Sequence, residues 1–554
     1  MLGWVDRALV AIIAWIAVNW VLAIAHALTR PNLFIAAALF LIAAISLVAR
    51  TPPVPCHPSP VPYLVYLPIA LWCAFVLWRG YVVPPASHDA LTYHLPKAVM
   101  IVRAHGYTHF DAPDPRIRTF PSNYELLLAD VLILTGSDRV TEWIGTAFYV
   151  LFLGVVAMVA RRWWGEGLHV TACVLAAAGA PLLLLHSGHD KNDVMTAVFA
   201  AAALYWAAVW CVRRGAVPAM MAIACGVTAI GTKMSAAAIV IGIAPFGIAA
   251  LIRHPPRVKP FAGAVLFAAL ALLFCGGWVF LQNMRSPAAP HVAAGLPTSQ
   301  YGEWSHLWEV PYLAIRASLG LKTKWPWPAE NLFSSHYGPV FALAALALPF
   351  CVWRYRGDRE RAIAGIAAAI ASFVLLPLVQ YPQIALPSIL RYTAFILPVL
   401  YGWTIAPLLR GSKYAPVVIG ALMVIFAVNA FDIAYNDTLV PLAYARWCAR
   451  HPGTRQIFWS ENHAEIVVDL LAGPHDTVAI RAGRNTWIYP AYGAHLSRTV
   501  VFVEDKVPDS AQWVAVDAED PQFVEALARD PRFELVYRRN EQAVFHRKEK
   551  GPRV

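Results

Sequence analysis

Residues 193–214 read DVMTAVFAAAALYWAAVWCVRR, an apolar run closed by two arginines. Between Asp193 and Arg213 no side chain carries a formal charge, and a helix of about 20 residues is about 30 Å long, enough to cross the hydrocarbon core of a bilayer. The whole chain has the same character, because its 554 residues are 59% hydrophobic and only 14% charged, with a mean hydropathy of +0.54. Soluble domains are about 25% charged. The sequence therefore predicts an integral membrane protein and excludes a disordered chain or an ordinary soluble enzyme.

Comparable apolar runs predict about thirteen membrane-spanning helices, so the expected fold is a polytopic α-helical membrane protein. The first run is too long, and too polar at its end, for a cleaved signal peptide. The seventh and eighth runs are separated only by a short polar break around Lys233. The expected spans lie near 8–28, 31–49, 62–82, 141–160, 168–186, 193–212, 216–232, 235–252, 261–281, 336–354, 361–380, 391–409 and 414–434.

The basic residues predict the orientation of these spans. Five clusters fall on alternate loops, and loops rich in Lys and Arg stay on the cytoplasmic side. The N-terminus is then cytoplasmic, whereas the loops 83–140, 186–192 and 282–335 and the tail lie outside. The net charge of +11 reads as cytoplasmic anchors beside anionic lipid, with no nucleic-acid partner. The clusters are Arg161-Arg162, Arg213-Arg214, Arg253 to Lys259, Arg354 to Arg361 and Arg410 to Lys413.

The composition changes near residue 436, which divides the chain into a membrane domain (1–435) and a C-terminal domain (436–554). In the tail, short β-branched and aromatic runs alternate with amphipathic ones, so we expect a small α/β domain outside the membrane. The expected strands are 478–480, 499–503, 513–516 and 533–537, and the expected helices are 462–471 and 521–528.

The first external loop carries an acid directly after the third span, in the run Ser87-His-Asp-Ala-Leu-Thr-Tyr-His-Leu-Pro-Lys97. Asp89 stands before an amphipathic stretch, 90–104. Partial desolvation there would raise the pKa of Asp89 and suit it to proton transfer, or the carboxylate could pair with a cation. The alternative is that Ser87 or Asp89 only caps the helix that follows.

The second external loop, His186-Ser-Gly-His-Asp-Lys-Asn-Asp193, is dense in ionisable groups. Such groups between two spans are costly unless they have partners. Capping by Asn192 or Asp193 can account for only part of them. His186, His189 and Asp190 could bind a divalent metal, but their spacing fits no specific motif, so we expect no metal.

Cations stand at three further span ends, where each could hold a phosphate or simply snorkel toward the membrane surface. These are Lys233, Arg391 beside Tyr392, and Arg285 in the run 282–285. The third loop, with Trp304, Trp308, Lys322, Lys324, Trp325 and Trp327, reads as an interfacial segment. Acids and cations therefore meet on the outer side, which is a plausible site for a lipid-linked phosphate.

At these residues the chain resembles the GT-C glycosyltransferases, in particular the bacterial family-39-like enzymes related to protein O-mannosyltransferases and the lipid A aminoarabinose transferase. The stretch Asp89 to Pro96 resembles their acidic first-loop motif, and the resemblance covers roughly residues 60–410. Further agreement comes from Pro121-Ser-Asn-Tyr-Glu125, Lys191-Asn-Asp193, Gly231-Thr-Lys233, Asn283 after Trp278, and Arg391-Tyr392.

The resemblance implies a GT-C-like helical domain with a catalytic cavity at the outer face of a bacterial inner membrane. It implies transfer, with inversion, of a sugar from a polyprenyl-phosphate donor to an acceptor lipid, glycan or protein. Asp89 would be the base, and Asp193, in preference to Asp190, the second-loop acid. Lys233 and Arg391, with Lys191, would bind the donor phosphate. Further substrate contacts are expected from His88, Tyr93, His94, Asn123, Glu125, Asn283 and Tyr392.

One departure from the family pattern bears on metal use. Many relatives carry a second acid after the first, whereas Ala90 follows Asp89 here. A metal bridged by paired carboxylates is therefore not favoured.

Two other classes of function fit part of the pattern. A transporter or flippase of lipid-linked or anionic solutes would also carry intramembrane charges, but would show inverted repeats, and none is visible. A non-catalytic envelope assembly protein would not need Asp89 and Asp193. Convergence of Asp89, Asp193, Lys233 and Arg391 in space would favour the transferase.

Overall fold

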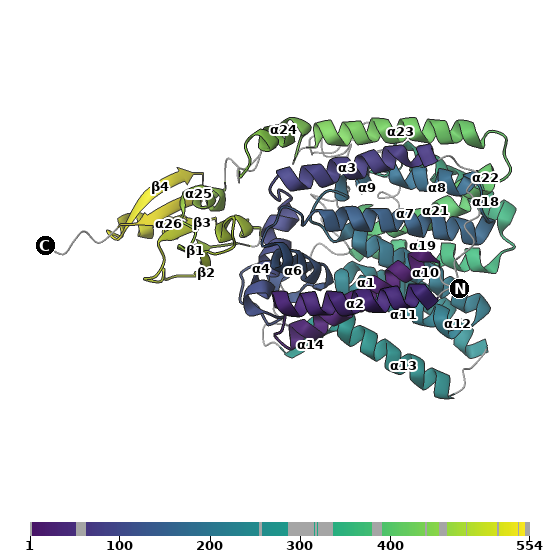
Figure 1. Ribbon diagram of the computed structural model, residues 1–554, viewed down its shortest axis with the longest axis horizontal. Coiled ribbons are helices and arrows are strands. Elements are labelled where there is room, and N and C mark those ends of the chain that lie inside the picture. Colours follow the sequence, from purple (N-terminus) through teal and green to yellow (C-terminus); the bar gives the residue numbers. More distant parts are fainter. Residues whose placement is uncertain are drawn as a thin grey trace.

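The computed structural model describes residues 3–50, 63–253, 258–285, 315, 318–319, 336–378, 390–437, 440–453, 463–483, 485–517, 520–540 and 542–548. Helices form a bundle, and a small unit containing a sheet adjoins one end of it, next to α4 and α6 (Figure 1). The expected interfacial segment with Trp304, Trp308, Lys322, Lys324, Trp325 and Trp327 lies outside the described residues.

The helices of the bundle follow the apolar runs of the sequence. In the first part of the chain they are α1 (Trp4–Ile24), α2 (Arg30–Arg50), η1 (Tyr63–Tyr66), α3 (Leu67–Val82), η2 (Ala90–His94), α4 (Leu95–Ala104), α5 (Pro115–Thr119), α6 (Asn123–Thr135), α7 (Trp143–Trp164), α8 (Leu168–Ala178), α9 (Pro181–His186) and α10 (Asp193–Arg213). Further on they are α11 (Ala216–Thr232), η3 (Met234–Ala236), α12 (Ala237–Arg253), α13 (Val258–Leu272), η4 (Leu273–Gly277), α14 (Trp278–Arg285), α18 (Pro339–Tyr355), α19 (Arg359–Leu378), η6 (Arg391–Ile396), α21 (Leu397–Trp403), α22 (Ile405–Leu409) and α23 (Ala415–Asn436).

These helices make the chain a multipass membrane protein. Eight of the described helical segments are long and apolar enough to cross a bilayer, and four further apolar helices are shorter. Each expected span coincides with a described helix or chain of helices. The number thirteen itself stays a prediction.

Three expected spans are interrupted by a break in the helix, which corrects the sequence reading. The span 168–186 divides into α8 and α9, because Pro181 lacks an N–H and Ala180 before it is extended (ψ 119°). The span 261–281 is broken inside η4, where Gly276 has a φ of +115°. The span 391–409 begins as the 3₁₀ helix η6 and is divided again between α21 and α22.

Burial separates a central helix from peripheral ones. Nearly all side chains of α10 from Asp193 to Val209 are buried. The helix α23 is even more apolar, yet Val417 and Phe431 on it are 70% and 68% exposed. An apolar face turned away from the protein is stable only against lipid, so α23 lies at the periphery of the bundle.

The C-terminal unit is the expected α/β arrangement. Its sheet has the order β2-β1-β3-β5-β4, with β1 parallel to both neighbours and β5 antiparallel to both of its neighbours. Four strands and two helices are confirmed, but the fifth strand was missed because polar residues at both ends leave only Ala543 to Phe545 apolar. The elements are α24 (Leu442–Arg450), α25 (Ala464–Leu471), β1 (Thr477–Arg481), η7 (Tyr489–Tyr492), β2 (Thr499–Phe502), β3 (Trp513–Val516), α26 (Pro521–Arg529), β4 (Phe533–Arg539) and β5 (Gln542–Arg547).

A close contact between backbones fixes the end of α11. A Cβ at Gly231 would lie 1.9 Å from the carbonyl oxygen of Cys275, so no other residue fits there without a shift. That carbonyl lies at the break in η4, and Asn123 Nδ2 donates to it (2.9 Å). Asn123 Oδ1 accepts from Trp20 Nε1 at 2.7 Å. This clamp places the end of α11, and with it Lys233.

We expect Gly231→Ala to lower the melting temperature of the purified protein, because overpacking a filled contact costs about 1–3 kcal/mol. Gly420→Ala in α23 is the matched control, since a Cβ there meets nothing within 4 Å. Thermal unfolding in detergent measures both. Equal melting temperatures for the two variants would contradict the contact.

Candidate functional site

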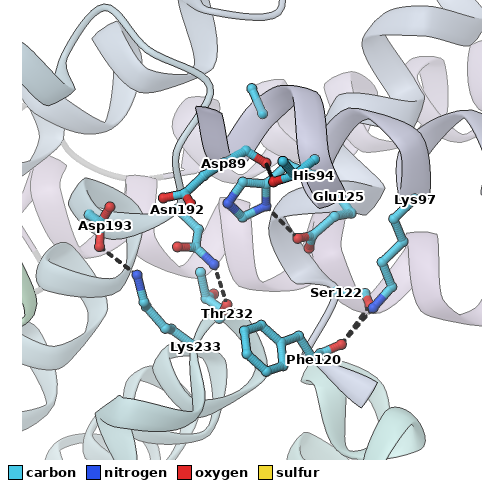
Figure 2. Close-up of polar contacts among 12 residues, drawn as sticks. Asp89, His94, Lys97, Phe120, Ser122, Glu125, Asn192, Asp193, Thr232 and Lys233 are labelled. Atoms are coloured by element: carbon cyan, nitrogen blue, oxygen red, sulfur yellow. Dashed lines mark hydrogen bonds and ion pairs between the residues drawn. The ribbon is translucent and has the colours of Figure 1, made fainter. Parts of the chain in front are cut away.

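Four charged side chains from four distant segments form one ion-pair network. Arg391 Nη1 donates to Asp89 Oδ2 at 2.8 Å and lies 3.7 Å from Asp193 Oδ2. Lys233 Nζ donates to Asp193 Oδ1 at 2.6 Å, as Figure 2 shows. None of the four side chains is more than 14% exposed. The structure thus brings together the four residues whose convergence favours the transferase reading.

Local backbone geometry presents Lys233 to this network. The helix α11 ends at Thr232, and Lys233 is extended (φ −156°, ψ 126°) before η3 begins. Asn192 Nδ2 donates to the carbonyl oxygen of Thr232 at 2.9 Å, which ties the start of α10 to the end of α11 (Figure 2). The side chain of Asn192 therefore joins two helices and makes no capping bond.

Asp89 is available to the network because another residue caps the helix. The backbone N–H of Ala90 donates to Ser87 Oγ (3.3 Å), whereas the carboxylate of Asp89 makes no capping bond. Burial alone would raise the pKa of Asp89, but the charges of Arg391 and Lys191 outweigh it and hold that pKa well below its usual range. The expectation of a raised pKa is wrong, and the alternative of pairing with a cation is confirmed.

Two more residues join the network from its sides. Burial lowers the pKa of Lys191, and its ammonium group also interacts electrostatically with Asp89 and Arg391. The ring of Tyr392 lies 4.2 Å from Lys233 Nζ, and its hydroxyl accepts from Arg391 Nη2 at 3.2 Å. An aromatic face and a phenol thus hold both cations in place.

Other expected substrate contacts have structural partners. His94 Nδ1 and Glu125 Oε1 form a buried pair at 2.6 Å (Figure 2). Asn283 Nδ2 donates to the carbonyl oxygen of Thr119 at 2.9 Å. The guanidinium carbon of Arg116 lies over the ring of Tyr93, 4.6 Å from the ring centroid. Each of these side chains is therefore held by a partner within the protein.

The rest of the second loop belongs to a different cluster. Asp190 Oδ2 accepts from Thr141 Oγ1 (2.9 Å), and burial raises the pKa of Asp190 to about 7. His189 Nε2 lies 3.2 Å from Asp437, which pairs with Arg79 at 3.0 Å. This geometry places Asp193, and not Asp190, in the network.

The side chain of Arg79 fills the space beside this loop. Among the residues that the structure describes, His186, His189 and Asp190 do not form a group of three converging ligand atoms. A Cβ at Gly188 would lie 2.2 Å from Arg79 Nη2, which donates to the Gly188 carbonyl oxygen at 2.7 Å. The loop is therefore packed around a guanidinium.

Sequence reasoning missed two contributors from the C-terminal unit. Trp487 Nε1 donates to Nδ1 of His88, the residue before Asp89, at 3.0 Å. Asn485 Oδ1 accepts from Arg116 Nη2 at 3.0 Å. No motif in the tail marks either residue, because their contacts depend on how the unit sits against the first loop.

One cavity of the molecule lies apart from the network. It is lined by residues of α4 and of the C-terminal unit, including Arg103, Tyr492 and Phe502. The four network residues do not line it, and it has no part in the site.

Solved structures share this fold. ArnT from Cupriavidus metallidurans bound to undecaprenyl phosphate is 14% identical, with a TM-score of 0.57 over 88% of this chain and 99% of that chain. The apo form of the same protein is 15% identical, with a TM-score of 0.54 over 87% and 97% of the two chains. No protein-family model and no curated protein matches the sequence. The chain therefore shares its fold with ArnT, which confirms the polytopic helical fold with a small C-terminal α/β unit that the sequence predicted.

We expect Arg391→Ala to destabilise the protein, because removing one partner of a buried ion pair costs about 3–5 kcal/mol. The double variant Arg391→Ala with Asp89→Asn should recover part of this loss, since the second change removes the unpaired charge. Thermal unfolding in detergent gives all the values.

Glu166→Gln is the control for this cycle. Its partner Arg161 lies 3.1 Å away, but the two side chains are 73% and 45% exposed. Such surface pairs contribute about 0–1 kcal/mol, so the melting temperature should stay near that of the wild type. Strictly additive effects of Arg391→Ala and Asp89→Asn would show that the pair is not coupled.

Proposed function

We propose that the protein transfers a sugar from a polyprenyl-phosphate donor to an envelope acceptor, with inversion at the anomeric carbon. The observation that carries this proposal is the network of Asp89, Asp193, Lys233 and Arg391. It lies in a fold shared with a protein that was solved with undecaprenyl phosphate bound. Undecaprenyl phosphate is a polyprenyl phosphate without a sugar, so it belongs to the lipid class that the resemblance implies for the donor.

The charge of the network suits a phosphate that gains negative charge during the reaction. Lys191, Lys233 and Arg391 against Asp89 and Asp193 give a formal sum of +1, three minus two. A phosphodiester carries one negative charge, whereas a phosphate monoester carries about −1.5 to −2 at pH 7. Prearranged cations therefore stabilise the leaving phosphate more strongly than the bound donor, which is how electrostatic catalysis works.

The proposed step is a single displacement. The acceptor hydroxyl or amine attacks the anomeric carbon and gives its proton to Asp89, while the bond from that carbon to the phosphate oxygen breaks. The bond electrons leave with the phosphate, beside Lys233 and Arg391. Asp193 touches both cations and acts as a positioning residue.

Donor binding would also adjust the strength of the base. While Arg391 pairs with Asp89, the carboxylate has a low pKa and is a weak base. A donor phosphate competes for the same guanidinium. Once that pairing weakens, the pKa of Asp89 rises toward its usual value, so the base becomes effective when the donor is in place.

The proposed location follows from the orientation that the basic loops predict. The network would lie at the outer face of a bacterial inner membrane, with the N-terminus in the cytoplasm and the C-terminal unit outside. A lipid-linked donor enters such a site sideways from the bilayer. The acceptor then comes from the envelope, as a lipid, glycan or protein.

We expect Asp89→Asn to reduce sugar transfer by at least about a hundredfold, the low end of what a general base contributes. The reaction is followed with polyprenyl-phosphate sugars and an envelope extract as acceptor. Asp111→Asn is the control, because Asp111 is an exposed acid of the same loop and should leave transfer unchanged.

A binding measurement separates loss of catalysis from loss of structure. Asp89→Asn should still be stabilised by undecaprenyl phosphate in thermal unfolding, whereas Lys233→Ala should lose that stabilisation because the phosphate loses a cation. Near wild-type transfer by Asp89→Asn would rule out this residue as the base.

We expect alkaline phosphatase fused after Asp111 to be active, because that enzyme folds only outside the cytoplasm. The same reporter fused after Arg356, in a basic loop, should be inactive. The reversed pattern would place Asp89 in the cytoplasm and end the proposal.

A further inference from the structure

Three potential metal ligands converge in the C-terminal unit. His463 precedes α25, Glu465 lies in the first turn of α25, and Asp517 directly follows β3. One ligand atom from each residue lies within 4.8 Å of the others. Within the described part of the chain, no other three His, Cys, Asp or Glu residues meet in this way.

Glu465 is buried without a partner. Its exposure is 0%, and neither carboxylate oxygen accepts a hydrogen bond from another residue. No Lys, Arg or His pairs with it among the described ion pairs, and its charged neighbour is another acid, Asp517. A buried carboxylate in this position is costly unless a cation or a proton balances it.

His463 has a buried ring nitrogen without a hydrogen-bond partner. Its ring stacks on that of Trp487, with centroids 3.7 Å apart and planes 6° from parallel. Stacking fixes the ring but leaves its edge available, and the buried Nδ1 has no hydrogen-bond partner. An imidazole held in this way is already oriented as a ligand.

Gln542 connects the start of α25 with the end of β3. Its side-chain oxygen accepts from the backbone N–H of Ala464 at 2.8 Å, and its Nε2 donates to Asp517. The start of α25 and the end of β3 are thus tied by one amide. Such bonds to a ligating carboxylate orient it in metal sites.

We propose that His463, Glu465 and Asp517 bind a divalent transition-metal ion, with Zn²⁺ as the best match to one imidazole and two carboxylates. Zinc takes nitrogen and oxygen donors at about 2.0–2.2 Å and often keeps one position for water. The three donor atoms already lie within 4.8 Å of one another. The ion would supply the positive counter-charge that the buried carboxylate of Glu465 otherwise does not have.

Protonation of the two acids agrees with this assignment. Burial raises the pKa of Asp517 to about 6, and burial followed by the charge of Asp517 holds the pKa of Glu465 well above its usual range. Carboxylates bind a metal ion in their deprotonated form, so protons compete with the ion for this pair.

The ion would lie close to the first loop but outside the transfer site. Trp487, which stacks on His463, donates to His88 beside Asp89. The assigned role is therefore structural, since the ion fixes the face of the C-terminal unit that contacts this loop. The inference does not depend on the proposed transfer reaction.

The test uses untagged full-length protein in detergent, treated with EDTA and then dialysed against micromolar free Zn²⁺. We expect one zinc per chain by mass spectrometry in the wild type, and none in Glu465→Gln or His463→Ala. The melting temperature of the wild type should rise with Zn²⁺ and fall with EDTA, while both variants should be insensitive.

Matched controls are Glu525→Gln and His475→Ala, which change the same residue types at exposed positions of the same unit. Both should keep the zinc. Glu465→Gln keeps the size of the side chain and needs no counter-charge when buried, so it should elute as a folded protein and melt no lower than metal-free wild type. A wild type that takes up no zinc, or a folded Glu465→Gln that keeps it, would overturn the assignment. A proton shared by Glu465 and Asp517 would then be what balances the buried carboxylate.

Discussion

A guanidinium shared between two carboxylates connects segments that are far apart in the chain. Arg391 opens η6, Asp89 precedes η2 and Asp193 opens α10, so one side chain links the first loop to the central and late helices. In a nearly buried site these charges are poorly screened by salt and water. Their separation would leave a carboxylate or a cation without compensation. The same requirement that holds the segments together therefore also concentrates charge where a phosphate can be bound.

The network depends on irregular backbone at helix ends. Lys233 reaches Asp193 because α11 stops one residue earlier, and α11 is held there by Asn123 and by the break in η4. Non-helical backbone at membrane depth is stable only where its polar groups find partners within the protein. Here the amides of Asn123 and Asn192 supply those partners. The kinks and the site are thus parts of one arrangement.

The sequence predicts the helices and the charged residues of the site better than the helix breaks and the contacts between distant segments. Apolar runs predicted the helices, and the residues around Asp89, Asp193, Lys233 and Arg391 predicted the network, because length, hydropathy and charge act locally. The breaks at Pro181 and Gly276 were missed, since an apolar run looks the same whether it is straight or broken. The pKa of Asp89 was misjudged, because its direction depends on Arg391, which is distant in sequence. The contacts of Trp487 and Asn485 could not be foreseen, as they arise only when the C-terminal unit meets the first loop.

Gly188 imposes a restriction on how this sequence can diverge. The guanidinium of Arg79 occupies the space that any side chain at position 188 would need. A mutation there would displace a buried cation from Asp437 and release the turn that leads to Lys191 and Asp193. A side chain at position 188 therefore requires the guanidinium of Arg79 to move away from Gly188, and the two positions should covary in homologues.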